Sequence, residues 1–325
     1  MEERHDYLVL TLDLHNHLNE KKMNSLEFWK KVKQRKIDVI ASTEHSCYNP
    51  KEAFEKLLKT KPKDKILIPG IELDTSIGHV LAYGFDDSIF DFQEFFGEKV
   101  DFKKVLKTAK ENNIILSIAH PWGFSYDSAA YILGAEKLRQ LIRKEDIGVE
   151  TYTGIIGYLS YFVYESKWIK KPLSLFEFLE RNRLTRYTGL SRIGKKLKKK
   201  LESKQTEVSM RCASAIELGK EAKFNTAGSD THTLNRIGTG VLKIKFPKNL
   251  HLNNKNVLTE LKKKKIIWSG PLHKQSSTGT YYKPSYALTK KELFEGVKYA
   301  AKIVAKRSKT TQRIVRKLKR TKVKK

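Results

Sequence analysis

Two histidines one residue apart, His15 and His17, follow the apolar run Tyr7–Leu12. In a strand, residues two apart point to the same face, so Asp13, His15 and His17 would project together where that strand ends. Two neutral imidazoles beside a carboxylate are the beginning of a metal site. A pair of exposed histidines on a loop is the alternative, and so short a motif leaves both interpretations open.

More histidines and carboxylates recur along the chain. They stand in five short segments: Thr43-Glu44-His45, Pro69-Gly70-Ile71-Glu72, Gly78-His79-Val80-Leu81, Ala119-His120-Pro121 and Gly228-Ser229-Asp230-Thr231-His232. Together with His15 and His17, these segments contain six of the nine histidines. Such a set suits several divalent cations bridged by carboxylates.

The segments that must position these side chains alternate between short apolar runs and amphipathic stretches, which is typical of β/α units. The predicted strands cover 7–12, 37–43, 66–68, 79–83, 114–119, 148–152 and 225–227, and the predicted helices cover 25–35, 50–59, 102–112, 138–144 and 213–223. In β/α barrels, functional side chains lie at the C-terminal ends of the strands. Almost every candidate ligand stands at such an end, although His79 begins its strand. We therefore expect an α/β barrel with the ligands at one edge.

This ordered set resembles the PHP (polymerase and histidinol phosphatase) family of metal-dependent phosphoesterases over roughly residues 7–273. The resemblance implies a distorted seven-stranded (β/α)7 barrel that holds two or three divalent metal ions, commonly Zn, Mn or Fe. By similarity, one ion would be held by His15, His17, Glu72 and Asp230, a second by Glu72, His79 and His120, and a third would be served by His45 and His232.

The resemblance also assigns roles around these ligands. Asp13 would orient a ligating histidine. The family often has an acidic residue shortly after the second histidine. Here Lys22 stands near that place and Glu20 is the only acid nearby, so the sequence leaves open whether a third ion is bound. The chemistry would depend on Glu72, His120 and Asp230.

Arg236 follows the last candidate ligands and is a candidate phosphate clamp, because a guanidinium binds two oxygens at once. A surface arginine is the alternative. Cys47 could be a soft ligand, although a small buried residue is the simpler interpretation.

The predicted phosphoesterase domain covers 1–273 and contains an insertion, 153–212, that begins aromatic and then becomes basic. The insertion would be a lid or substrate-binding element, or a helical subdomain with an aromatic core. A linker, 274–288, precedes a basic C-terminal helix or tail, 289–325, which has thirteen Lys or Arg and no acid from Lys298 onward. That tail would either bind phosphate groups or be a solvent-exposed basic segment without a partner.

The net charge of +29 over 325 residues favours polyanionic partners, with a solvated lysine-rich surface as the alternative. The two cysteines do not indicate a disulfide framework, and no signal-peptide core or membrane-spanning run is present, so we expect a soluble cytoplasmic protein without a membrane partner. The leading hypothesis is a phosphoesterase acting on DNA, RNA or a nucleotide. The alternatives are a small-molecule phosphatase of the histidinol-phosphate type and a binding protein with an inactive metal cluster. The oligomeric state is open.

Overall fold

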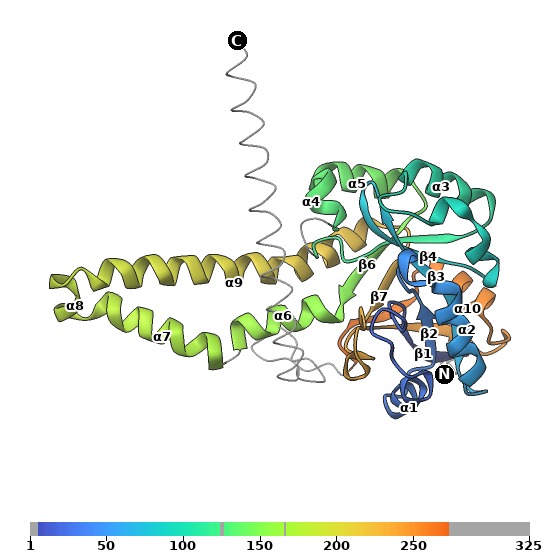
Figure 1. Cartoon of the computed structure of the whole chain (residues 1–325), viewed down its shortest axis with the longest axis horizontal. Helices are drawn as coiled ribbons and strands as arrows, with labels where there is room; N and C mark the ends of the chain where they lie inside the picture. The colour runs from blue at the N-terminus through green and yellow to red at the C-terminus, as the bar shows by residue number, and fades with distance from the viewer. Residues whose placement is uncertain (1–5, 124–126, 166, 273–325) are drawn as a thin grey trace, which may run out of the picture. The chain divides into compact units, whose positions relative to one another are not determined.

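The computed structural model describes residues 6–123, 127–165 and 167–272, all within the first of the two compact units of the chain, Met1–Ser285 (Figure 1). The predicted linker 274–288 and basic helix 289–325 lie outside the described residues. No helix in the described part of the chain is long and apolar enough to cross a membrane.

The described residues form one sheet in the order β7-β6-β5-β4-β3-β2-β1-β8-β9. Its strands are β1 Tyr7–Asp13, β2 Val39–Ser42, β3 Ile66–Thr75, β4 Gly78–Tyr83, β5 Ile115–Ile118, β6 Gly148–Thr153, β7 Asn225–Gly228, β8 Val241–Pro247 and β9 Ile266–Gly270. The Leu14 N–H donates to the Ala227 carbonyl at 3.1 Å, which brings the end of β1 against β7. The sheet is thus a nearly closed barrel.

The sheet departs from the predicted seven-stranded (β/α)7 barrel. All seven predicted runs are strands, but β8 and β9 add two more, and β8 pairs antiparallel with β1. β4 is also antiparallel to both of its neighbours, β3 and β5. The prediction of seven strands is therefore wrong in number. The reversal of β4 follows from the two-residue turn between β3 and β4, which leaves no room for a crossover helix.

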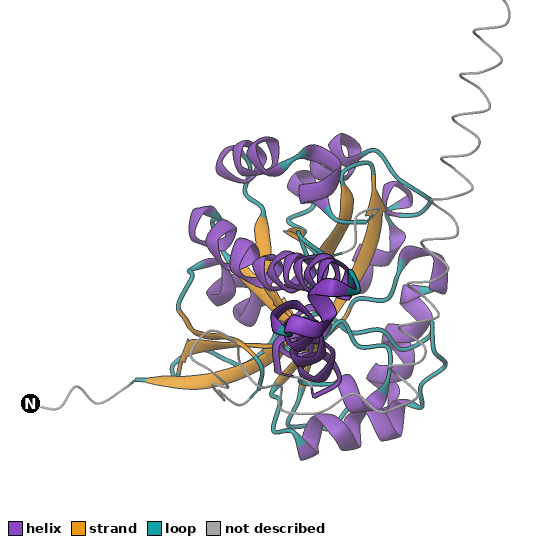
Figure 2. Cartoon of the chain, turned by 90° about the vertical axis from the view of Figure 1, so that its left-hand side faces the viewer, coloured by secondary structure: helices purple, strands orange, loops and turns teal. Residues whose placement is uncertain are grey.

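Helices flank the sheet, and those between β6 and β7 extend away from it, as the two views of the chain show (Figures 1 and 2). They are α1 Ser25–Gln34, α2 Pro50–Thr60, α3 Phe102–Glu111, α4 Ala129–Leu133, α5 Ala135–Lys144, α6 Gly154–Glu165, α7 Lys167–Arg181, α8 Arg183–Tyr187, α9 Leu190–Glu221 and α10 Asn254–Lys262. Four short 3-10 turns are η1 Ser46–Tyr48, η2 Asp87–Asp91, η3 Gln93–Phe95 and η4 Leu234–Arg236.

Helix α1 shows how local sequence sets an element. The Asn24 side chain accepts the N–H groups of Leu26 and Glu27, which satisfies donors that the first turn leaves unpaired. Phe28 and Val32, one turn apart, are buried against the sheet. Leu26, in the same helix, is 63% exposed. It stands two residues before Phe28 and hence about 200° around the helix from it.

Residues between β6 and β7 form α6 to α9, and the helix predicted at 213–223 is the last part of α9. Helices α6 and α7 pack along α9, and the C-terminal part of α9 packs on β6 (Figure 1). The aromatic start of the insertion is partly a packing unit, because the rings of Tyr158 and Phe162 stack at 6.3 Å between centroids. The tip carries exposed apolar side chains, with Tyr187 91% exposed.

Candidate metal centre

The candidate ligands meet at one edge of the barrel because of strand direction. β1, β2 and β3 are parallel, as are β5, β6 and β7, so their C-terminal ends share an edge. His79 begins β4 and was the exception in the sequence. Since β4 runs antiparallel, His79 lies opposite Asp74 near the end of β3. The start of β4 is thus at the same edge as the other strand ends.

Glu72 of β3 is the centre of the cluster. Its carboxylate is 1% exposed and lies within ion-pair distance of five imidazoles. Glu72 Oε2 lies 3.3 Å from His15 Nε2, 3.3 Å from His17 Nε2 and 3.0 Å from His45 Nδ1, and Oε1 lies 2.8 Å from His79 Nδ1 and 3.1 Å from His120 Nε2. One buried carboxylate therefore connects both halves of the predicted ligand set.

Asp230 and His232 complete the cluster from the loop after β7. Asp230 Oδ1 lies 3.4 Å from His17 Nε2 and 3.5 Å from His232 Nδ1. The other ring nitrogen of His232 contacts Glu20 Oε2 at 2.7 Å. Glu20 thus pairs with one of the two histidines predicted to serve a third ion, whereas Lys22 is exposed. The structure brings all eight predicted metal-ligating residues into this one cluster.

Two carboxylates that received no role from the sequence hold the histidine rings. Glu150 of β6 contacts His15 Nδ1 at 3.1 Å and accepts the His120 backbone N–H at 2.7 Å. Glu44 contacts His17 Nδ1 at 3.3 Å and accepts the Leu18 N–H at 2.8 Å. Both contacts turn the Nε2 atoms toward Glu72. An acid inside the apolar strand 148–153 is the one sequence signal that could have drawn attention to Glu150, although it does not show what the side chain contacts.

The Asp13 carboxylate binds backbone groups around the cluster, including the N–H of the candidate ligand His15. Its carboxylate accepts the Ser229 N–H at 2.8 Å and the Gly238 N–H at 2.9 Å, and it also contacts the Ser229 hydroxyl. These partners belong to the loop that carries Asp230. Asp13 therefore fixes the backbone of that loop, and the contacts to imidazole Nδ1 come from Glu44 and Glu150.

Backbone conformation at two of the candidate ligands is unusual. His120 has φ of 24° and Asp230 has φ of 52°, both in a region that non-glycine residues rarely adopt. Such strain persists only where the surroundings hold the residue in place, and it clusters at functional sites. At His120 the hydrogen bond from its N–H to Glu150 is one such restraint.

The histidines and carboxylates of the cluster shift one another's pKa values. Burial lowers the pKa of His45 to about 4, so that imidazole is neutral and able to ligate. Burial also disfavours charge on His17, but hydrogen bonds with Asp230 and Glu44 raise its pKa to about 10. Burial would raise the pKa of Glu72, yet the surrounding histidines hold it well below its usual range. Protonated imidazoles therefore neutralise the buried carboxylates that a bound cation would otherwise neutralise.

The donor atoms fit divalent cations. Three groups have all ligand atoms within 4.8 Å of one another: His17, His45 and His232; His15, His17 and Asp230; and His45, Glu72 and His79. Tetrahedral ligands at about 2.1 Å from a zinc ion lie about 3.4 Å apart, which these groups approach. His17 and His45 each belong to two groups, so the three groups overlap in one cluster. Because an imidazole nitrogen has one lone pair, each of these rings would ligate one ion, and the carboxylate of Glu72 is the group able to bridge. One of the three groups combines His45 with Glu72 and His79, whereas the resemblance combined His120 with those two residues.

The two remaining candidates lie apart from these groups. The guanidinium carbon of Arg236 lies over the ring of Tyr158, 5.2 Å from its centroid, and the residue is buried. Cys47 is exposed, so its interpretation as a small buried residue is wrong.

Comparison with known proteins gives structural neighbours but no sequence relative. No protein-family model matches the chain, and no curated protein is significantly similar to it. PsfC from Pseudomonas syringae PB-5123 matches with a TM-score of 0.50 and 12% identity, over 78% of this chain and 89% of PsfC. At that identity the match shows a shared fold and nothing more.

Two further structures match at lower TM-scores. One is a two-domain protein from Bacteroides vulgatus ATCC 8482 containing a predicted PHP-like metal-dependent phosphoesterase, with a TM-score of 0.47 and 15% identity over 80% of this chain. The other is the lesion-specific endonuclease PfuEndoQ from Pyrococcus furiosus, with a TM-score of 0.44 and 12% identity over 85% of this chain. The chain spans 64% of the length of each of these two proteins.

Proposed function

We propose that this protein is a metal-dependent phosphoesterase of the PHP type, a hydrolase of phosphoric esters, and that its substrate is a nucleic acid or a nucleotide. The observation that carries the proposal is Glu72, a buried carboxylate within 2.8–3.3 Å of five imidazoles. A structural ion pair needs one partner, whereas five ring nitrogens around one carboxylate suit a set of shared cations.

The division of tasks follows from the contacts. The ions would be held by His15, His17, His45, Glu72, His79, His120, Asp230 and His232. Bound divalent cations supply a water molecule of lowered pKa and neutralise charge on phosphoryl oxygens. Glu150 and Glu44 hold the rings of His15 and His17 in the orientation that points Nε2 at Glu72. Arg236 is kept as a candidate for binding substrate phosphate.

Charge supports a polyanionic substrate. The chain has a net charge of +29, and lysines at the start of α9, among them Lys195, Lys196, Lys199 and Lys200, are exposed. Exposed Lys and Arg attract a phosphate backbone by releasing its counterions. Tyr187 of α8, at the tip of the same insertion, offers a ring on which a base can stack.

The test is hydrolysis by the full chain loaded with Mn²⁺ or Zn²⁺, with labelled DNA, labelled RNA and p-nitrophenyl phosphate as separate substrates. We expect cleavage of a nucleic acid that stops after chelation. Glu72→Gln should lower the rate by about 100-fold or more and reduce bound metal, because it removes the shared negative charge. Turnover of p-nitrophenyl phosphate alone would favour the small-molecule phosphatase, and full activity of Glu72→Gln would reject the metal mechanism.

A further inference from the structure

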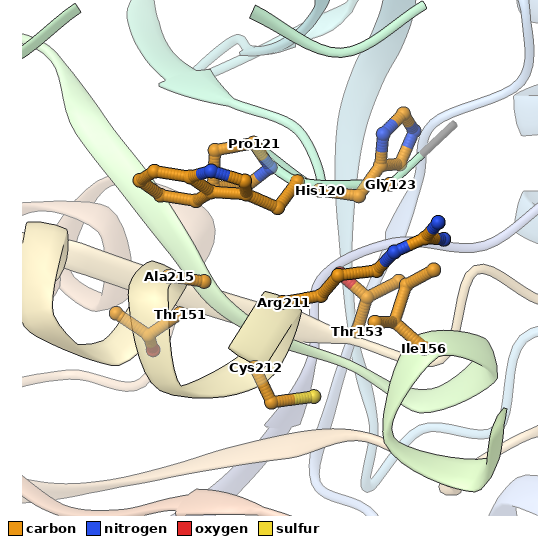
Figure 3. Close-up of a pocket in the computed structure, with 10 residues that line it drawn as sticks. His120, Pro121, Gly123, Thr151, Thr153, Ile156, Arg211, Cys212 and Ala215 are labelled. Atoms are coloured by element: carbon orange, nitrogen blue, oxygen red, sulfur yellow. The ribbon is translucent and has the colours of Figure 1, made fainter. Parts of the chain in front are cut away.

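A pocket lies beside the metal centre, between the barrel and the insertion (Figure 3). The space between its walls is about 210 Å³, counted out to open solvent. One wall is the turn 120–123 after β5, which begins with His120, and the opposite wall is helix α9, with Arg211 and Cys212. Thr153 at the end of β6 also lines it. The insertion therefore contributes residues next to a candidate ligand.

Arg211 is the charged side chain that α9 presents to this pocket. The side chain is 16% exposed, and its Nη2 lies 3.4 Å from Oε1 of Glu207, one turn earlier on the helix. Its Nε atom is buried and has no hydrogen-bond partner among the described residues. Figure 3 shows the guanidinium directed toward His120. A buried donor without a partner costs free energy that an anion in the pocket would recover.

The wall opposite Arg211 is connected to the metal centre through Glu150. The Thr153 hydroxyl donates to Glu150 Oε2 at 2.9 Å, and the His120 N–H donates to the same oxygen at 2.7 Å. The His120 ring then contacts Glu72 at 3.1 Å. An anion held at Arg211 would thus lie against residues whose positions are set by the cluster.

We propose that Arg211 binds non-bridging oxygens of a substrate phosphate beside the metal centre, so that helix α9 of the insertion forms part of the substrate site. The inference rests on the proposed function for the identity of the ligand. A guanidinium suits this task because its planar fork pairs with phosphate bidentately. Arg236 differs, since its guanidinium lies over the Tyr158 ring.

The experiment uses the full chain loaded with Mn²⁺ and compares Arg211→Gln and Arg211→Lys with the wild type. Inorganic phosphate binding is measured by calorimetry, KM and kcat are measured with p-nitrophenyl phosphate, and metal content is measured separately. Arg143→Gln is the matched control, because Arg143 of α5 is 58% exposed and pairs with Glu221 of α9. Arg236→Gln tests the other arginine.

We expect Arg211→Gln to raise the phosphate Kd and the KM about tenfold or more, with metal content and kcat changed less than about twofold. Arg211→Lys should lie between Gln and the wild type, because it keeps the charge and loses the fork. If Arg211→Gln does not fold, the role of Arg211 is tested with Arg211→Lys, by the same measurements of phosphate Kd, KM, kcat and metal content.

Two results would overturn the inference. One is phosphate binding by Arg211→Gln, or by Arg211→Lys where only that variant folds, that equals the wild type. The other is a wild-type protein that binds metal but no phosphate. Absence of hydrolysis by the wild type would instead count against the proposed function, and phosphate binding would still decide the role of Arg211.

Discussion

At the scale of single residues, Glu150 holds two candidate ligands with one side chain. Its Oε1 contacts the ring of His15, and its Oε2 accepts the backbone N–H of His120, whose φ is 24°. Carboxylates that fix the ring orientation of a metal ligand contribute to metal affinity without touching the ion. Glu150 is therefore a positioning residue.

Glu150→Gln keeps the volume of the side chain and removes its charge. We expect metal affinity to fall about 10- to 100-fold, because His15 loses its charged partner. The measurement is a competition titration with a metal-binding dye. Glu217→Gln is the control, since Glu217 is exposed on α9 and pairs only with Lys220 among the described residues. Equal affinity of Glu150→Gln and the wild type would show that the contact does not position His15.

Much of the candidate site could be predicted at this scale. His15, His17, His120 and Asp230 follow apolar runs, and the rule that functional residues stand at strand ends was enough to select them. Glu150 could not be assigned in that way. It lies inside its strand, and only the closed barrel shows that its side chain reaches His15.

At the scale of elements, the closure of the barrel places the first ligands. Leu14 at the end of β1 donates to Ala227 of β7, and the Asp230 N–H donates to the His15 carbonyl at 2.9 Å. Gly228 makes this approach possible, because a Cβ there would lie 2.4 Å from both Cβ and N of His15. A contact between two strand ends that are 213 residues apart in sequence (Leu14 and Ala227) gives no local signal.

Gly228→Ala should separate β7 from β1 and move His15. We expect a loss of about 1–3 kcal/mol of unfolding free energy, as for an overpacked core, together with weaker metal binding. Denaturant unfolding and the dye titration measure the two effects. Gly134→Ala is the comparison: φ is 85° there, but the added methyl meets open space, so it should affect stability alone. Unchanged metal affinity in Gly228→Ala would contradict the role of this close approach.

The strands also show that sequence patterns predict where a strand lies but not its direction. The β8 pattern was present, with Leu242, Ile244 and Phe246 buried and Lys245 exposed between two of them, as alternation predicts. The reversal of β4 was not predictable from periodicity, because an apolar run has no direction. Its consequence, the arrival of His79 at the ligand edge, follows from pairing with β3.

At the scale of the whole molecule, bound metal should contribute to stability. The cluster buries several carboxylates and imidazoles in contact, and a ligand that binds only the folded state adds about 2.7 kcal/mol at 100 times its Kd. For a domain of this size, with an unfolding entropy of about 2.1 cal/mol/K per residue, that corresponds to about 4–5 °C in Tm. We expect chelation to lower Tm by that amount and added Mn²⁺ or Zn²⁺ to restore it. A smaller shift in Glu72→Gln is the control, and equal Tm values in loaded and chelated wild type would exclude tight binding at the cluster.

The charge of the whole molecule leads to the last prediction, which concerns how nucleic acid is held. If the exposed lysines of α9 contact phosphates, the logarithm of the binding constant falls with the logarithm of salt concentration, with a slope of about 0.9 per phosphate for duplex DNA and about 0.7 for a single strand. Replacing Lys199 and Lys200 by Gln should reduce that slope by about 1.4 to 1.8.

Lys103 and Lys104 are the matched pair, since they are also adjacent and exposed but lie on α3, outside the insertion. Their replacement by Gln removes the same charge, so it isolates the effect of position from that of net charge. Binding is measured by fluorescence anisotropy from 50 to 300 mM salt with protein kept in excess. Equal salt-dependence slopes for the two double variants would show that the α9 lysines attract polyanions only through the net charge of the protein. The α9 lysines would then make no direct phosphate contacts.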